Sequence, residues 1–240
     1  MGIDERRERE KERLRAAILD AARDILSEEG LDGLSMRAIA ERIEYSPATI
    51  YLYFRNKDDL IREVVLEGFR RMRSYATREL EALEAGASPM AQYAALGRSY
   101  VAFALENTAH LNVMFQLPKA PSVECPAPAD SGVGVGAEGE APWSRVIWTL
   151  QRAIDEGEID IPDAARGGLI GWALMHGLVT LYLGGHLAED IESREEFEAL
   201  VAESMRSLYE GWKARPEGGS ASGGGAGRAG GEETRAGAET

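Results

Sequence analysis

The residues from Ser46 to Lys57 combine small side chains, hydroxyl groups and a lysine within a short stretch of the chain. Hydroxyl groups reach phosphate oxygens, and short side chains let a helix approach the edges of base pairs. Lys57 follows Asn56, a residue type that caps helices, so its ammonium group would lie beside the free N–H groups of a helix start. The stretch therefore has the chemistry of a surface that contacts a nucleic acid.

Residues suited to catalysis form no comparable set. The sequence contains no nucleophile elbow, phosphate-binding loop, Cys/His cluster with metal-ligand spacing or spaced pair of carboxylates. The single cysteine, Cys125, cannot form an internal disulfide, and its nearest basic neighbour is Lys119. We therefore expect a protein that is not an enzyme, with no catalytic residues, no metal site and no cofactor.

Two helices joined by a very short turn must position the Ser46–Lys57 stretch. The first carries Met36, Ile39, Ala40 and Ile43 and has Ser35 as its N-cap. The second begins at Ser46-Pro47, because serine caps a helix and proline suits its first turn. The residues Glu44-Tyr45-Ser46 alone separate the two, which is the spacing of a helix-turn-helix.

Apolar spacing assigns the faces of these helices. The expected shared core consists of Ile39, Ile43, Ile50 and Phe54, with the small Ala40 allowing close approach. The outer face and N-terminal end of the second helix are left to Pro47, Ala48, Thr49, Tyr51 and Tyr53. Taken singly, each tyrosine is also an ordinary amphipathic helix residue and Lys57 a solvated charge; the spaced set as a whole favours contact with DNA.

The remaining pattern is helical throughout, which predicts an all-α protein. An earlier helix with apolar residues from Leu14 to Leu26 is expected to stop at Gly30, and a helix capped by Asn56 to run to about Ala85. Further helices are expected at 88–106, 108–117, 143–156, 163–183 and 194–213, the last starting with the capping box Ser193…Glu196.

Net charge is unevenly distributed along the chain. The whole chain carries −14, but residues 1–80 are close to neutral at −1 and residues 81–240 carry −13. The acidity therefore does not exclude DNA as a partner of the N-terminal part. The arginines of residues 6–15 alternate with acids, which fits either a solvated helix face or a minor-groove arm. Neither a membrane span nor a secretory signal is predicted, so we expect a cytoplasmic protein.

Residues 12–66 resemble the tetracycline-repressor (TetR) family of transcriptional regulators. The resemblance rests on Leu34-Ser35-Met36-Arg37-Ala38-Ile39-Ala40 and on Thr49-Ile50-Tyr51-Leu52-Tyr53-Phe54-Arg55-Asn56-Lys57. It implies that Thr49, Tyr51 and Tyr53 contact backbone or thymine, Lys57 a phosphate, and Arg37, Pro47 and Ala48 the bases. The candidate DNA contacts are Ser35, Arg37, Ser46, Pro47, Ala48, Thr49, Tyr51, Tyr53 and Lys57. The turn departs from the family, which often has Gly-Val where this chain has Glu44-Tyr45; either the positive φ is lost or the turn is strained.

The resemblance also implies that C-terminal helices dimerise and enclose a ligand pocket. The helix at 163–183 contains four glycines, which cost about 1 kcal/mol each relative to alanine and indicate close backbone packing. Two helices from each chain would form a four-helix interface, or both would pack inside one monomer. The candidate interface residues are Gly168, Trp172, Val179, Leu200, Ser204 and Leu208.

Trp172, His176 and Gly177 resemble the Trp-His-Gly signature of one C-terminal subgroup of this family. His176 is either a ligand-sensing residue or a hydrogen-bonded core histidine. The candidate pocket residues are Tyr93, Tyr100, Phe103, His110, Met114, Trp172 and His176, although aromatic residues at helical spacing also form plain core.

Together these patterns predict a homodimeric transcriptional regulator, acting as a repressor. It would bind double-stranded DNA at a palindromic operator and be released by a small apolar or amphipathic effector. The alternative is a DNA-binding regulator without a small-molecule ligand, controlled by a protein partner. The expected domains are 1–60 for DNA binding, 61–215 for effector binding and dimerisation with a flexible loop at 118–142, and a disordered glycine-rich tail at 216–240.

Overall fold

The computed structural model describes residues 3–116 and 142–213, and within these ranges the chain is built from helices. The helices are α1 (Ile3–Gly33), α2 (Met36–Arg42), α3 (Pro47–Tyr51), α4 (Lys57–Glu81), α5 (Pro89–Glu106), α6 (Thr108–Leu111), the π-helical turn η1 (Asn112–Gln116), α7 (Pro142–Asp155), α8 (Ala164–Leu183) and α9 (Arg194–Trp212). In the described part, β pairing is limited to an isolated bridge between Ile159 and Lys213. The all-α prediction is confirmed.

Helix starts follow the capping residues that the sequence offers. The side chains of Ser35, Ser46 and Asn56 each accept a hydrogen bond from the backbone N–H three residues later. Ser193 does the same for α9, while the Glu196 carboxylate accepts from Glu192 N–H at 2.8 Å. These side chains satisfy N–H groups that have no partner within the helix, so they fix where each helix begins.

Several helix ends differ from the predicted ones. Gly30 interrupts α1 as predicted, with φ 71°, but one further helical turn follows it to Gly33. Helix α3 ends at Tyr51, so the buried Phe54 lies just beyond it. Helix α4 ends at Glu81 rather than near Ala85. The segment expected as one helix at 108–117 divides into α6 and η1.

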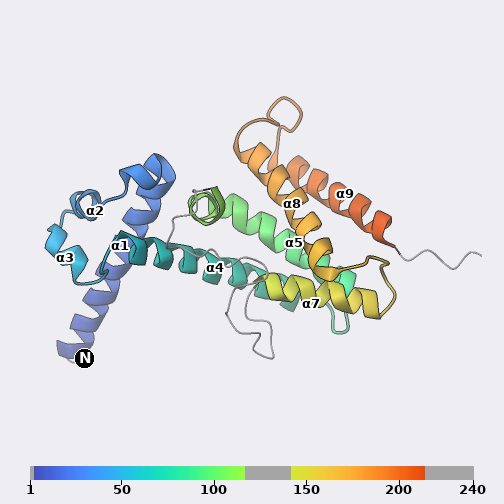
Figure 1. Cartoon of the computed structure of the whole chain (residues 1–240), viewed down its shortest axis with the longest axis horizontal. Coiled ribbons are helices and arrows are strands. Elements are labelled where there is room, and N and C mark those ends of the chain that lie inside the picture. The colour runs from blue at the N-terminus through green and yellow to red at the C-terminus, as the bar shows by residue number, and fades with distance from the viewer. Residues whose placement is uncertain (1–2, 117–141, 214–240) are drawn as a thin grey trace, which may run out of the picture.

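The helices form two regions joined by α4. Helices α1 to α3 lie at one end, α5 and α7 to α9 at the other, and α4 runs between them (Figure 1). A continuous core of buried side chains nevertheless spans both regions, from Ile18 and Ile50 to Phe103, Val179 and Phe197. A smaller cluster surrounds Leu150, Tyr93 and Trp212. The boundary predicted at residue 60 falls in the first turn of α4, where Leu60 is fully buried.

The loop at 118–142 and the tail at 216–240 lie outside the described residues, apart from Pro142, which begins α7. Among the helices of the described part, none combines the length and the apolar character of a membrane span.

Candidate DNA-contact surface and effector domain

Helices α2 and α3 are held together by apolar side chains on their inner faces. Ile39, Ala40 and Ile50 are completely buried and Phe54 is 2% exposed. The guanidinium of Arg15 on α1 lies 5.2 Å from the centre of the Phe54 ring, a cation–π contact that connects the segment just after α3 to α1. These contacts fix the inner face of α3 against the core, and its outer face is exposed to solvent.

The outer face of α3 carries most of the predicted contact residues. Pro47, Ala48 and Tyr51 are exposed, whereas Thr49 and Tyr53 are half-buried. The Thr49 hydroxyl lies 3.0 Å from the Ser46 hydroxyl, so these two groups hydrogen-bond each other at the start of the helix. Tyr53 packs partly against the core. The structure thus brings Ser46, Pro47, Ala48 and Tyr51 together on one exposed surface.

Leu52 is a contact candidate that the sequence prediction omits. Its side chain is 83% exposed, the largest fraction among the exposed large apolar residues of the described chain, and Tyr45 in the turn is 51% exposed. Helical spacing contains the signal, because residue 52 lies four positions after Ala48 and so shares its face. An exposed leucine beside Tyr51 can contact the methyl groups of thymine.

The turn between α2 and α3 keeps the backbone conformation that glycine normally supplies. Glu44 has φ 59° and is the only non-glycine residue with a positive φ in the described part. Glu44 N–H donates to the Glu41 carbonyl at 3.3 Å, and Tyr45 N–H donates to the Ala40 carbonyl at 2.8 Å. This is the hydrogen-bond pattern of a Schellman motif. Of the two alternatives for this turn, the strained one is therefore correct.

Basic side chains around this surface are engaged within the protein. The Lys57 ammonium donates a hydrogen bond to the Leu31 carbonyl near the end of α1, which leaves two of its three N–H groups for other acceptors. Arg37 is 83% exposed and its Nε donates to Glu41 Oε1 at 2.9 Å, a bond that raises the pKa of Arg37. To contact a base, the guanidinium of Arg37 must give up this ion pair.

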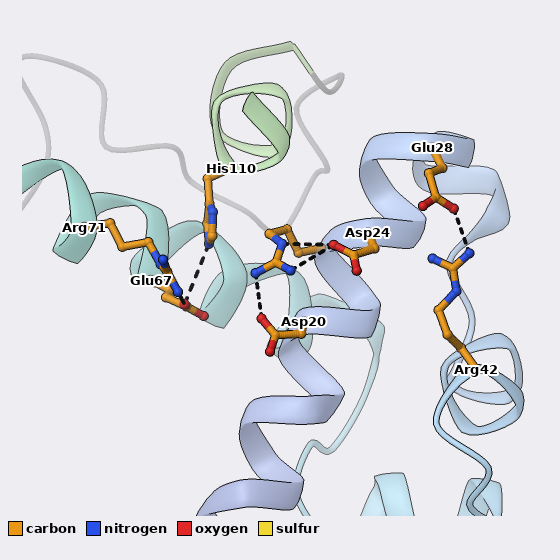
Figure 2. A network of polar contacts seen from close by, with 8 residues as sticks. Asp20, Asp24, Glu28, Arg42, Glu67, Arg71 and His110 are labelled. Atoms are coloured by element: carbon orange, nitrogen blue, oxygen red, sulfur yellow. Dashed lines mark hydrogen bonds and ion pairs between the residues drawn. The ribbon is translucent and has the colours of Figure 1, made fainter. Parts of the chain in front are cut away.

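A network of polar contacts lies on α1, α2 and α4 (Figure 2). Arg23 on α1 bonds Asp20 at 2.6 Å and Asp24 at 2.9 Å, and Arg42 on α2 bonds Glu28 at 2.7 Å. On the neighbouring α4, Glu67 pairs with Arg71 at 2.7 Å.

His110 of α6 points into this network between α1 and α4 (Figure 2). Its Nε2 lies 3.8 Å from Glu67 Oε1 and has no hydrogen-bond partner among the described residues. Burial, followed by the positive charge of Arg71, lowers the pKa of His110 to about 4 although Glu67 opposes the shift. The imidazole is therefore neutral at pH 7, and α6 meets the other helices through an uncharged side chain.

The aromatic residues of α8 form a cluster with α5 and η1. Trp172 stacks on His176 with ring centres 5.3 Å apart, and Phe115 lies 5.5 Å from the same histidine. The Tyr100 hydroxyl and His176 Nδ1 are 2.6 Å apart and share a hydrogen bond. Burial lowers the pKa of His176 and raises that of Tyr100. This geometry matches the interpretation of His176 as a hydrogen-bonded core histidine.

A groove of about 800 Å³ lies between α5 and α9, bordered by the C-terminal end of α4. We refer to it as the α5–α9 groove. Of the seven candidate pocket residues, Tyr93 lines it and the other six do not. Phe103 is completely buried, Met114 and His110 pack beside Gly68 of α4, and Tyr100, Trp172 and His176 belong to the aromatic cluster. The structure therefore does not bring the seven together around this groove.

The candidate interface residues of α8 face inward. Val179 is completely buried, and a side chain at Gly168 would meet Val146 and Trp143 of the same chain. The outward face of α8 instead carries Leu169, Ile170 and Leu181, with exposed fractions of 47%, 51% and 43%. On α9, the candidates Leu200, Ser204 and Leu208 are half-buried. The exposed apolar residues of α8 therefore lie on a different side of the helix from the predicted interface residues.

Comparison with known proteins agrees with this arrangement. Residues 18–64 match the family model for bacterial regulatory proteins of the tetR family, and residues 93–204 match that for the tetracyclin repressor-like C-terminal domain. The HTH-type transcriptional regulator UidR of Escherichia coli K12 is 42% identical over 57 residues, which cover 24% of this chain and 29% of UidR. The class D tetracycline repressor of Escherichia coli is 32% identical over 62 residues, covering 26% of this chain and 28% of that protein. The chain thus matches less than a third of the length of these curated relatives.

Solved structures extend the likeness to most of the chain. A protein of unknown function from Rhodococcus sp. RHA1 is 27% identical with a TM-score of 0.63, covering 84% of this chain and 96% of that one. A TetR-family transcriptional regulator from Haemophilus influenzae, 20% identical, shares the fold with a TM-score of 0.57 over 85% and 98% of the two chains. These matches show the fold, an N-terminal helix-turn-helix followed by a helical C-terminal domain. The chain belongs to the tetracycline-repressor family.

Proposed function

We propose that this protein is a sequence-specific transcriptional repressor that binds a palindromic operator as a homodimer and leaves it when a small-molecule effector binds. The exposed face of α3 carries this proposal. Ile50 and Phe54 anchor the helix from within, while Pro47, Ala48 and Tyr51 remain exposed. A short helix held this way can enter a major groove without disturbing the core.

The contacts at the operator follow from the chemistry of this face. Pro47, Ala48 and Leu52 would approach base edges and thymine methyl groups, and the Tyr51 hydroxyl would reach the backbone. Lys57 and the free N–H groups at the start of α4 would bind a phosphate, because a helix start attracts anions. Ser35, Arg37, Thr49 and Tyr53 stay candidates with smaller or indirect roles, since their side chains are capping, paired or half-buried.

The dimer would use the outward face of α8 together with α9. Leu169, Ile170 and Leu181 leave apolar surface on α8 that a second copy would cover. Two recognition helices must then reach major grooves separated by one helical turn of DNA, about 34–36 Å, or a multiple of it. A palindromic operator would reflect the two-fold symmetry of the protein.

The effector part of the proposal is supported by the α5–α9 groove. A volume of about 800 Å³ lies within the usual range of small-molecule sites, about 300–1,000 Å³. This observation favours a small-molecule effector over control by a protein partner alone. Trp172, His176 and Gly177 support the narrower proposal that the C-terminal domain belongs to the Trp-His-Gly subgroup.

Selection of genomic DNA on the purified full-length protein tests the proposal. The protein is incubated with fragmented DNA of its source organism, and the retained fragments are sequenced. We expect enrichment of a palindromic sequence that then binds in fluorescence anisotropy at physiological salt far more tightly than a scrambled duplex of equal length. Equal binding to both duplexes, or retention without any shared sequence, would contradict sequence-specific regulation.

A further inference from the structure

We propose that the α5–α9 groove binds an amphipathic carboxylic acid, an elongated apolar molecule with one carboxylate head. The inference rests on the proposed function in one respect: it assigns this ligand class to the effector. The site itself is argued from the shape, the lining and the charge of the groove.

The groove is elongated because α5 and α9 run antiparallel along it. Arg194 at the start of α9 contacts Glu106 at the end of α5 with a distance of 3.3 Å between Nη2 and Oε1. At the opposite ends of the same helices, the rings of Trp212 and Tyr93 are 6.0 Å apart. From Met90 to Glu106, α5 rises about 24 Å at about 1.5 Å per residue. A long chain or extended ring system fits this shape better than a compact molecule does.

Apolar side chains form the bed of the groove. They come from both helices, with Met90, Tyr93 and Val101 on α5 and Val201 and Met205 on α9. All but Met205 are buried, so these groups are already shielded from bulk water. The two methionines add flexible, polarisable surface that adapts to different apolar shapes. An apolar ligand body would contact these side chains.

Charged side chains border the groove with an excess of arginine. Its lining contains Arg78, Arg98, Arg194 and Arg206 against Glu79, Glu106 and Glu198. This balance is unusual in the C-terminal two-thirds of the chain, where residues 81–240 carry a net charge of −13. A local positive surface within an acidic domain selects an anion over a cation.

The ion pairs inside the groove show which arginines are available. Glu79 bonds Arg98 at 3.3 Å, and Arg194 holds both Glu198 at 2.7 Å and Glu106 at 3.3 Å. Arg206 has no ion-pair or hydrogen-bond partner among the described residues.

The other unpaired guanidinium, that of Arg78, lies over the ring of Tyr75 at 4.8 Å. With all three carboxylates paired, the lining is left with one uncompensated positive charge. A single carboxylate matches that charge, and its two oxygens fit the planar fork of a guanidinium such as that of Arg206.

Calorimetric titration of the full chain with three probes of equal length tests the ligand class. Dodecanoate, dodecanol and dodecylamine, each below its aggregation limit, share the apolar chain and differ in head group. We expect saturable binding of dodecanoate at one site per chain, and at least about tenfold weaker binding of the neutral and cationic probes. Equal binding of dodecanol and dodecanoate would overturn the assignment of an acid.

Two pairs of variants test the position of the site. R206Q removes the unpaired guanidinium and is expected to weaken dodecanoate about tenfold, whereas R166Q, an exposed arginine on α8 outside the groove, should leave binding unchanged. A202W places an indole in the groove from an exposed position on α9 and should abolish binding, whereas A16W, the same change at an exposed position on α1, should not. All four positions are exposed, so folding is retained and is checked by circular dichroism. Unchanged binding in both R206Q and A202W would overturn the groove as the site.

Operator binding is measured separately so that the two proposals fail in different ways. In one outcome, dodecanoate binds wild type but not A202W and leaves the operator complex intact. This result would confirm the acid site and contradict its role as the effector site. Release of the operator by dodecanoate in A202W as readily as in wild type would overturn the groove while leaving the repressor proposal intact.

Discussion

Glu44 has a positive φ, a backbone conformation for which glycine is the most favourable residue. A side chain at φ 59° brings Cβ close to the following carbonyl oxygen, at a cost of about 1–2 kcal/mol. Two hydrogen bonds in the turn, from Glu44 and Tyr45 to α2, hold the residue there. The turn therefore keeps the geometry that α3 needs while retaining strain.

Replacing Glu44 by glycine should stabilise the protein. Relief of the strained φ is partly offset by the greater freedom of glycine in the unfolded chain, so we expect E44G to raise the free energy of unfolding by about 0.5–1 kcal/mol. Urea unfolding followed by circular dichroism measures the change. E44A serves as the control because it removes the charge but keeps Cβ; an equal gain in E44A would attribute the effect to the charge instead.

Lys57 is expected to contribute to DNA affinity without contributing to sequence preference. Loss of one phosphate contact in K57A should weaken binding to all duplexes and reduce the slope of log K against log salt by about one unit. Anisotropy titrations at several salt concentrations measure this slope. R166A on α8 should have the wild-type slope. An unchanged slope in K57A would mean that its hydrogen bond to Leu31, rather than a phosphate, accounts for its position.

The residues that act locally are the predictable part of the site. Ser35, Ser46 and Asn56 cap their helices as expected, because a cap depends only on the residues that follow within one turn. Helical spacing places Leu52 on the face of Ala48, but spacing alone does not predict its exposure. An apolar side chain beside a core helix is ordinarily expected to be buried, and the exposure of Leu52 depends on where α3 ends. The contact of Lys57 with Leu31 joins residues distant in sequence, so no local pattern indicates it.

At the level of elements, two glycines of α8 have opposite surroundings. A Cβ at Gly171 would collide with the Tyr93 hydroxyl, whereas a Cβ at Gly177 would meet nothing within 4 Å. Both positions would gain helix propensity on replacement by alanine, about 1 kcal/mol. The difference in the free energy of unfolding between the two alanine variants therefore measures the packing of α8 against α5.

We expect G177A to raise the free energy of unfolding by up to about 1 kcal/mol and G171A to lower it by about 1–3 kcal/mol. Denaturant unfolding at one protein concentration compares the two. The double variant G171A/Y93F removes the colliding oxygen and should recover part of the loss. Equal stability of G171A and G177A would contradict the close approach of α5 and α8.

Helix α6 is expected to confer a pH dependence on stability through His110. The folded-state pKa of about 4 lies below the ordinary value of 6.5, so the unfolded chain takes up the proton first as the pH falls. The contribution of His110 to the free energy of unfolding is therefore fully present above pH 6.5. It decreases between pH 6.5 and 4, by at most about 1.4 kcal/mol per pH unit.

Unfolding free energies measured between pH 7 and 5, within the range of this His110 pKa shift, check the prediction. H110Q should lose this part of the pH dependence, whereas H186Q, which replaces an exposed histidine, should keep it. Parallel pH profiles for wild type and H110Q would contradict the assignment to His110.

Helix positions could be predicted to within a few residues, but the faces of the C-terminal helices could not. Helix α8 is apolar on nearly all sides, so periodicity does not distinguish Val179, which is buried, from Ile170, which is exposed. That choice is made by the packing of α5 and α7 against α8, which involves residues far apart in the sequence. The α5–α9 groove has the same origin, since it depends on the separation of two helices and not on any local pattern.

For the whole molecule, assembly is expected to depend on the outward face of α8. I170D introduces a charge at an exposed position, so we expect a monomer with unchanged helical content. Light scattering coupled to size-exclusion chromatography measures the mass. L52D, which places the same charge on an exposed leucine at the end of the DNA-contact region, should leave the dimer intact. A dimer that persists in I170D would place the interface elsewhere.

Helix α4 links the proposed DNA-contact surface to the α5–α9 groove. Its 25 residues run from Lys57, beside the proposed operator, to the wall of the groove at Arg78 and Glu79, and span about 37 Å. A tilt of about 5° at one end displaces the other by about 3 Å, close to the rise of one base pair. In a two-fold dimer the two displacements combine, so the gap between the recognition helices would change by up to twice that distance. A small rotation of α4 in each protomer would therefore move both recognition helices out of register with the major grooves of the proposed operator.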